Sequence, residues 1–545
     1  MRNSRTITAV VGGGLGAAAV LNMLGGGAGV AADSVSGFTL HGVPANPKAP
    51  GTSYPNVLSP ELAEIAVARG STRLENGTAE VPYYGYLGDG PMVPLPGSVT
   101  EATKTEPDKN TYLKLNGQTG ADSGYSYGRR FLYQGHEGGA GYITRINLDA
   151  NEAHRVTLMA TTDVAGNPLP TYDGSTYDPF AKRLLFTAEA GSEGGVWAAT
   201  LGVPSKVRDV SGALGRGGYE GVQNDSSGNV WLVEDVGGVT GADNPNAKQP
   251  NSFVYRFVPT DPGHLDQGRL QALRVISNDT GKAIVFHPNA VDADITSADR
   301  ADLHTYGMRF ATRWVTVHDT STQGNEPFDA NAAAKAAKAT PFKRPENGMF
   351  RPGSDFGQFY FTETGDTNLD TEAGARLGGY GAVYRLTQSS PDANTGSLSM
   401  FYRGNPGHTG FDNLSFFGRR GLVVVEDAGD TLHTQRNALD SAYLFDTQTQ
   451  YSDLSQRPVR ILAEGRDASA TIDSGLSDAD TPDYQNDGDN EITGIHVSNG
   501  DPTTQGILGT QIPRPFVGGS GWLAFYTAQH GDNVTNLIVR NRLGE

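Results

Sequence analysis

Residues 344–366 read RPENGMFRPGSDFGQFYFTETGD, and they contain a pattern that recurs along the chain. The segment opens with the acid Glu346 beside a Gly-containing turn and continues into an apolar strand over 358–362. That strand ends on a second acid, Glu363, and a second strand follows over 381–386. Short apolar runs bounded by Gly, Pro and Asp predict antiparallel β-strands joined by turns.

The same order of opening acid, strand, strand-end acid and second strand occurs in three more segments. They begin at Asp173, Glu220 and Asp412, and the two acids are 14 to 17 residues apart in all four copies. Looser copies begin near Arg130 and at Glu491. Repeated strand pairs predict blades stacked around an axis, because one blade cannot bury both of its faces. We therefore expect an all-β fold, a six-bladed β-propeller with helical and loop insertions, closed by pairing of N- and C-terminal strands.

The N-terminus predicts export. Arg2 and Arg5 precede a Gly- and Ala-rich apolar run, and small residues stand before Asp33, as at a signal-peptidase site. An uncleaved membrane anchor is the alternative. The expected segments are a signal peptide over 1–32, an irregular lead-in over 33–120, and the propeller over 121–545 with insertions at 262–340 and 463–490.

Two short helices are expected outside the repeated strands. One lies near residues 60–68 in the lead-in. The other covers 331–339, an Ala-rich run in the first insertion, with Asp329 as its N-cap.

Composition narrows the function further. The 545 residues carry a net charge of −18, which argues against a nucleic-acid partner, since phosphate backbones are bound by basic surfaces. There is no cysteine, so disulfides, thiolate metal ligands and cysteine nucleophiles are excluded. An excess of carboxylates suits hard cations, although it is also common on exported proteins that bind no metal.

If the copies are blades, their opening acids lie on a circle around the axis. These acids are Asp173, Glu220, Glu346, Asp412 and Glu491. Like charges at one centre raise one another's pKa or cost stability unless cations neutralise them. Several Ca²⁺ ions with oxygen ligands are the expected cofactor. The alternatives are that the acids cap turns, or that Arg344, Arg419 or Arg420 pairs with some of them.

The strand-end acids form a second set, Glu189, Glu234, Glu363 and Glu426. Either they belong to the same centre or they face solvent where the strands end. His136 and His530 stand at matching strand ends of the first and last copies. They are expected on the metal-lined face, with packing at a blade junction as the alternative.

Five segments resemble the alkaline phosphatase family PhoX, in the same order over residues 125–540. They are His136-Glu137, Arg344-Pro345-Glu346, Asp412-Asn413-Leu414, Glu491-Ile492-Thr493-Gly494 and Gln529-His530-Gly531. The resemblance implies a six-bladed propeller, export, and a central cluster of iron and calcium ions that hydrolyses phosphate monoesters. By position it implies that Glu220, Glu346 and Glu491 are metal ligands, with Glu137 as a further candidate. It also implies that Arg344 holds the phosphoryl group.

One position departs from the family pattern. The phosphatases that this chain resembles use a cysteine as an iron ligand in the second blade, and Asp173 occupies the corresponding position here. A carboxylate is a harder ligand than a thiolate, so the expected metal shifts from Fe³⁺ toward Ca²⁺ or another oxygen-preferring ion. The sequence is therefore similar to a diverged member of the family.

Arg344 and Glu346 flank Pro345, which biases Arg344 toward an extended backbone. Residues i and i+2 of an extended segment point to the same side. We therefore expect Arg344 and Glu346 to face one spot at the centre, as phosphoryl-binding guanidinium and metal ligand. The alternative is that the two side chains neutralise each other.

Together these observations predict an exported metal-dependent phosphoesterase that acts on a small phosphorylated substrate. Arg344 and His530 are the expected catalytic residues. We also expect a monomer with no nucleic-acid partner and no membrane association once the signal is cleaved. The alternatives are a calcium-stabilised binding propeller without catalysis, or another hydrolase, such as a lactonase, on the same scaffold.

Overall fold

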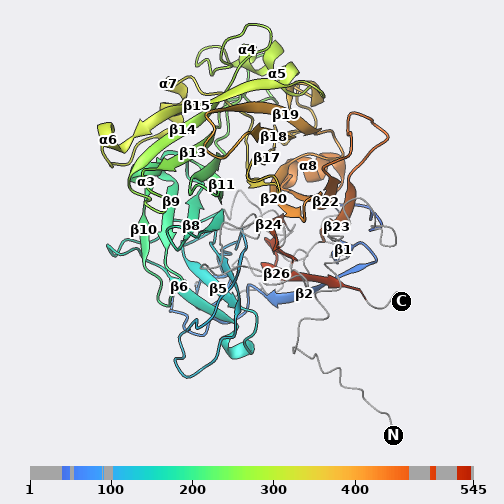
Figure 1. The fold of residues 1–545 in the computed structure, drawn as a ribbon. Coiled ribbons are helices and arrows are strands. Elements are labelled where there is room, and N and C mark those ends of the chain that lie inside the picture. The colour runs from blue at the N-terminus through green and yellow to red at the C-terminus, as the bar shows by residue number, and fades with distance from the viewer. Residues whose placement is uncertain are drawn as a thin grey trace.

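The computed structural model describes residues 40–48, 55–88, 90, 102–465, 491–498 and 524–541. These residues form an all-β protein in which antiparallel sheets surround a common centre (Figure 1). In this part of the chain, no helix has the length and apolar character needed to cross a membrane. The predicted signal peptide and nearly all of the predicted insertion 463–490 lie outside the described residues.

Two sheets consist of four strands that pair antiparallel in chain order. The first contains β3 (Thr111–Lys114), β4 (Arg130–Gln134), β5 (Ile143–Asn147) and β6 (Val156–Ala160), and the second contains β7 (Ser175–Asp178), β8 (Arg183–Ala188), β9 (Gly195–Ala199) and β10 (Val207–Asp209). In β8 every residue except Arg183 is buried. A strand buried on both faces is expected where neighbouring sheets stack on either side.

Two further sheets are completed by N-terminal strands. One contains β20 (Phe411–Phe417), β21 (Gly421–Glu426), β22 (Ser441–Asp446), β23 (Val459–Ala463) and β1 (Val57–Leu58), and the other contains β24 (Glu491–Val497), β25 (Ala524–Gln529), β26 (Val534–Arg540) and β2 (Leu62–Ala68). The predicted closure is confirmed, because β2 pairs antiparallel with β26. The helix predicted near 60–68 is wrong: the segment has good helix formers, but pairing with the edge of β26 outweighs this weak local preference.

The remaining sheet has nine strands. In spatial order they are β11 (Tyr219–Asn224), β12 (Val230–Glu234), β13 (Val254–Pro259), β14 (Gly268–Val275), β15 (Phe310–Asp319), β19 (Thr395–Arg403), β18 (Ala382–Gln388), β17 (Gln358–Glu363) and β16 (Gly348–Phe350). The strand β15 pairs with β14 on one side and with β19 on the other, so it joins two four-stranded runs at their outer edges.

The prediction of six separate blades is therefore wrong. The described strands form four small sheets and one nine-stranded sheet that is nearly closed, since its two end strands, β11 and β16, contact each other. The cause is the insertion at 262–340, which contributes β15. The propeller-like arrangement itself is present.

Short helices lie between the strands. They are α3 (Ser211–Leu214), α4 (Val291–Ile295), α5 (Ala298–Leu303), α6 (Thr320–Gln323), α7 (Ala330–Ala336) and α8 (Gly429–Arg436), with 3₁₀ turns η1 (Glu152–His154), η2 (Gly191–Glu193) and η3 (Ala375–Leu377). The predicted Ala-rich helix is confirmed as α7. Its N-cap is Asp329, whose side chain accepts a hydrogen bond from the Ala332 N–H at 2.8 Å.

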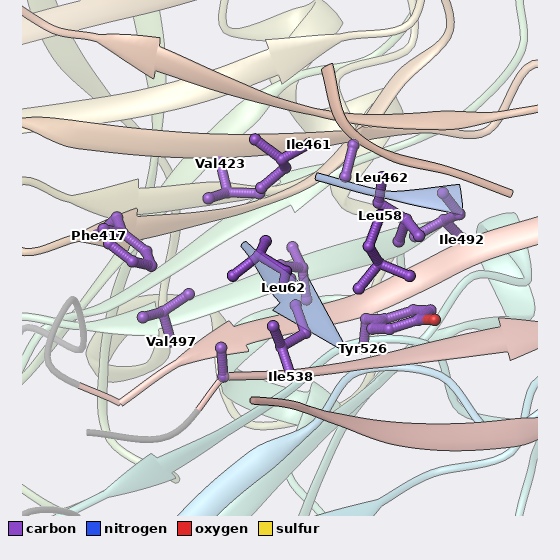
Figure 2. Close-up of a pocket in the computed structure, with 13 residues that line it drawn as sticks. Leu58, Leu62, Phe417, Val423, Ile461, Leu462, Ile492, Val497, Tyr526 and Ile538 are labelled. Carbon is purple, nitrogen blue, oxygen red and sulfur yellow. The ribbon is translucent and has the colours of Figure 1, made fainter. Parts of the chain in front are cut away.

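Apolar packing holds neighbouring sheets together. Figure 2 shows Leu58 of β1, Leu62 of β2 and Tyr526 of β25 gathered around a small gap. The gap lies between the two sheets that β1 and β2 complete. The cavity is only about 10 Å³ and its lining is apolar. A water needs at least that volume and several polar partners, so this gap is a dry packing defect and not a binding site.

Candidate metal centre

The first strand of each four-stranded run begins next to an acid. Asp108 and Asp173 precede β3 and β7, Glu346 precedes β16, and Glu220, Asp412 and Glu491 lie within β11, β20 and β24. The first strands contact one another in sequence around the centre, as in the neighbouring pairs β3 with β7, β7 with β11, β11 with β16 and β20 with β24. Five of these six acids were predicted, and Asp108 was not.

The acids gather in two groups of three. Oxygens of Asp108, Glu137 and Asp173 lie within 4.8 Å of one another, and so do oxygens of Glu220, Glu346 and Asp412. We call these the first and second carboxylate trios. Ca²⁺–oxygen bonds are about 2.3–2.6 Å long, so ligands on opposite sides of one ion are about 5 Å apart. Each trio therefore has the spacing of a single-ion site.

Close approach of backbones brings the trios together. The Gly221 N–H donates to Glu346 O at 3.0 Å, and the Thr187 hydroxyl donates to Glu220 O at 2.6 Å. A Cβ at Gly174 would lie 1.7 Å from Glu220 O. Glycine after Asp173 is therefore required for β7 to pack so closely against β11.

The centre has a large excess of buried negative charge. Burial, followed by the charges of Glu346, Asp173 and Asp412, raises the pKa of Glu220 well above its usual value. Burial and the Asp412 charge raise the pKa of Asp108 to about 7. Because shifts of this kind reflect unfavourable like-charge contacts, the ionised trios require compensating cations.

Part of the compensation comes from Lys109. Its buried ammonium donates to Asn413 Oδ1 at 2.7 Å and to Ile495 O at 3.3 Å, and it lies in the field of Asp412 and Asp108. One ammonium cannot neutralise both trios.

Hydrogen bonding leaves oxygens available. Among the described residues, no donor reaches the buried oxygens Asp173 Oδ1 and Glu220 Oε2. The other oxygen of Glu220 accepts from Asn347 Nδ2 at 2.6 Å, which fixes the carboxylate plane. An all-oxygen donor set with free, buried lone pairs fits a hard cation.

Glu491 and His530 lie beside the trios. His530 Nε2 is 3.3 Å from Glu491 Oε2 and 3.7 Å from Glu106 Oε1. Burial, then the Asp427 and Glu137 charges, raises the pKa of Glu491 well above its usual value. His136 differs from His530: it is fully buried, contacts Thr105 and Thr144, and stacks on Tyr142 at 3.9 Å between ring centroids. His136 therefore follows the packing alternative.

Arg344 lies at the second trio, but not as the sequence predicted. Its φ is +53°, so the residue is in the left-handed region and not extended before Pro345. The guanidinium donates from Nε to Asp235 Oδ2 at 2.8 Å, and Nη2 forms an ion pair with the same oxygen at 2.7 Å. Nη2 is also 3.5 Å from Glu346 Oε1. The main partner of Arg344 is thus Asp235, and its ion pair with Glu346, the predicted alternative, is the longer of the two.

Three of the strand-end acids serve a different purpose. Glu234 accepts from Asn331 of α7 at 3.0 Å, and Glu426 accepts from Arg436 of α8 at 3.0 and 3.2 Å. Glu363 binds Arg300 and His304 of the α5 region at 2.8 and 2.7 Å. Burial alone would raise the pKa of Glu363, but the Arg300 and His304 charges outweigh it and lower the pKa to about 2.

These three acids therefore anchor the helices to the sheets and neither face solvent nor enter the trios. Glu189, the fourth strand-end acid, differs from these three because it is exposed. The residues that follow two of the anchors, Asp235 and Asp427, face the centre instead. Burial, followed by the charges of Asp440 and Asp412, raises the pKa of Asp427 to about 7.

The fold and the carboxylate centre together define a propeller-like β-protein with a central cluster of acidic residues that could hold metal ions. Comparison with known proteins is consistent with a specific family: residues 212–436 match the family described as alkaline phosphatase PhoX. The matched segment contains the complete second trio and Arg344. The resemblance inferred from the motifs is thereby confirmed. No curated protein matches the chain.

One solved structure supports the fold, and others are less similar. PhoX from Pseudomonas fluorescens in complex with vanadate, a transition state analogue, is similar with 12% identity and a TM-score of 0.53, covering 92% of this chain and 98% of that chain. A gluconolactonase from Xanthomonas campestris has 10% identity and a TM-score of 0.36, covering 92% and 100%. The WD40 domain of Toxoplasma gondii coronin has 10% identity and a TM-score of 0.33, covering 91% and 88%. Only the first value is high enough to bear on the fold.

Proposed function

We propose that this protein is a metal-dependent phosphoesterase that hydrolyses phosphate monoesters. The observation that carries the proposal is the second carboxylate trio, Glu220, Glu346 and Asp412, with the Arg344 guanidinium beside it. A cation site next to a guanidinium is the arrangement that binds a phosphoryl group. The match to the PhoX family over the same segment supports it.

The trios assign the metal-holding residues. Glu220, Glu346 and Asp412 would hold one cation, and Asp108, Glu137 and Asp173 another. Glu491 is proposed as a further ligand from its position at the start of β24. Bound cations of this kind polarise phosphoryl oxygens and activate a nucleophile. With oxygen donors alone and no cysteine in the chain, Ca²⁺ is the first candidate. Fe³⁺ is the ion that the family resemblance implies, but the cysteine ligand that comes with it in that family is replaced by Asp173 here.

Arg344 would bind and orient the phosphoryl group. Asp235 takes its Nε and Nη2 edge, while no described residue accepts a hydrogen bond from Nη1. The side chain is 20% exposed, so this free edge is open to a ligand. As negative charge develops on the phosphoryl oxygens, a guanidinium fixed in advance stabilises it without reorganisation.

His530 would act at the opposite part of the centre. Its φ is +68°, and it is held beside Glu491 and Glu106. Non-glycine residues in the left-handed region cost free energy, and such strain tends to occur at functional sites. A histidine that faces acidic ligands is suited to hold or pass a proton at Nε2.

The location, the partner and the oligomeric state of the protein are proposed from the sequence. We propose that the protein is exported by the N-terminal signal to the periplasm, the cell surface or the medium. Its partner would be a small phosphorylated substrate, and it would act as a monomer.

The test is metal analysis of the purified protein, combined with hydrolysis of p-nitrophenyl phosphate before chelation, after chelation and after Ca²⁺ is restored. We expect bound metal, and activity that is lost and regained with it. Bound metal without hydrolysis of the phosphate monoester would favour the calcium-stabilised binding propeller. A lactone assay on the same preparation would test the lactonase alternative.

A further inference from the structure

A second cationic residue, Lys248, has its backbone next to the segment that pairs with Arg344. The Thr364 N–H donates to Arg344 O at 2.8 Å, and Asp366, which contacts Lys248, is two residues further along. Lys248 belongs to the hairpin between β12 and β13, where Thr240 and Lys248 pair and the Gln249 N–H donates to Val239 O at 2.8 Å. The Lys248 N–H donates to Asp366 Oδ1 at 2.9 Å. Both contacts hold the backbone of Lys248, so its side chain starts from a fixed point.

The charges that act on the Lys248 ammonium agree with this placement of its backbone. Burial lowers the pKa of Lys248, and the charge of Arg344 lowers it further, while Asp235, Asp366 and Glu346 raise it. Lys248 is half-buried. Lys248 and Arg344 are thus two cations on neighbouring segments near the second trio.

Each of the nearby carboxylates already has another partner, although Asp235 Oδ1 accepts no hydrogen bond from the described residues. Asp235 Oδ2 binds Arg344, and both oxygens of Asp366 accept from the Lys343 ammonium, at 2.9 and 2.7 Å. Glu346 accepts from the Thr364 hydroxyl and belongs to the second trio. No described residue forms a hydrogen bond or ion pair with the Lys248 ammonium. After these pairings, Lys248 is the cation left over.

We propose that Lys248 is a second phosphoryl-binding residue, which acts with Arg344 to select dianionic phosphate monoesters over monoanionic diesters. This inference rests on the proposed phosphoesterase function. A guanidinium and an ammonium on one ligand supply two positive charges, and a monoester dianion presents two negative ones. A diester has one negative charge and an additional substituent, so it gains less from the second cation.

The experiment compares the metal-loaded wild type with K248Q, K248R and the control K206Q. Lys206 is an exposed lysine beside β10, an outer strand. For K248Q, loss of one charged contact should raise the KM for p-nitrophenyl phosphate and the inhibition constant of inorganic phosphate by about 10-fold or more. Hydrolysis of bis-p-nitrophenyl phosphate should change much less. K248R should keep most of the monoester preference, and K206Q should match the wild type.

A second readout does not depend on turnover. Inorganic phosphate should raise the melting temperature of the metal-loaded wild type, and this rise should be smaller in K248Q. The melting temperature without phosphate reports whether K248Q is folded. If the wild type responds to phosphate and K248Q responds equally, the role of Lys248 is wrong and the phosphoesterase proposal stands. If the wild type neither hydrolyses the monoester nor responds to phosphate, both proposals are wrong.

Discussion

Arg344 donates from Nε to Asp235 Oδ2 at 2.8 Å, and its Nη2 forms an ion pair with the same oxygen at 2.7 Å, although the two residues are 109 positions apart. Asp235 follows β12, whereas Arg344 precedes β16, so the pair joins the two ends of the nine-stranded sheet. Arg344 has an unfavourable φ of +53°. Surrounding contacts must hold such a conformation, and Asp235 is the contact that fixes the guanidinium beside the second trio.

Replacing Arg344 by Lys should lower kcat/KM for a phosphate monoester by about 10²-fold, because a single preorganised donor to a developing oxyanion has an effect of that order. Lysine keeps the charge but cannot bind Asp235 and a phosphoryl group through separate edges. Steady-state kinetics together with metal analysis is the measurement, since metal content should not change. R313K, at an exposed arginine of β15, is the matched control. Equal activity of R344K and R313K would contradict the assigned role.

Replacing Glu346 by Gln should release metal from the second trio and abolish activity. An amide occupies nearly the same space but lacks the negative charge that attracts a hard cation. Removing one of several mutually repelling buried acids should not unfold the chain. The measurement is metal stoichiometry by elemental analysis, with circular dichroism to check folding. Retention of the full wild-type metal content would rule out Glu346 as a ligand.

Replacing Glu363 by Gln should destabilise the protein without removing metal, the opposite of the result expected for Glu346. Glu363 is buried against Arg300 and His304, at 2.8 and 2.7 Å, and outside both trios. Loss of its charge leaves Arg300 unpaired in the interior, so we expect destabilisation of about 3–5 kcal/mol. Metal content should stay at the wild-type value. Chemical denaturation and elemental analysis of E363Q and E346Q, side by side, separate the anchoring acids from the acids of the trios.

Stability in chelator should depend on pH in a defined direction. In the metal-free protein, the pKa of Glu106 is raised from 4.5 to about 8, and those of Asp108 and Asp427 are raised from 3.8 to about 7. The folded state then binds protons more tightly than the unfolded state. The stabilisation is complete below pH 4 and is lost as pH rises toward 8.

Melting curves measured in excess chelator between pH 5 and pH 9 should therefore shift to lower temperature as pH rises. Added Ca²⁺ should remove most of this shift, because a bound cation favours the ionised carboxylates and stabilises the native state by mass action. A melting temperature that is the same with chelator and with Ca²⁺ at pH 9 would contradict cation binding by the trios.

The repeat of acid and strand was enough to predict the all-β class, the propeller-like arrangement and five of the six acids around the centre. Asp108 was missed because a long loop, 115–129, separates β3 from β4 and hides the spacing seen in the other copies. The segment containing β3 was also read as irregular. The motif Glu106-Pro107-Asp108, an acid just before a short apolar run, was the signal that could have revealed it.

The residues at strand ends show why the sequence alone could not predict which acids face the centre. Glu234 and Asp235 are adjacent, yet Glu234 turns outward to α7 and Asp235 turns inward to Arg344. Neighbours in an extended chain point to opposite sides, and the sequence pattern does not say which side is the axis. Likewise β15, more than 30 residues beyond β14, joins two outer edges by hydrogen bonds that depend on where those edges lie in space. Local composition accounts for the strands and the acidic centre, whereas long-range pairing chose which acids face it, because that choice depends on contacts between segments far apart in the chain.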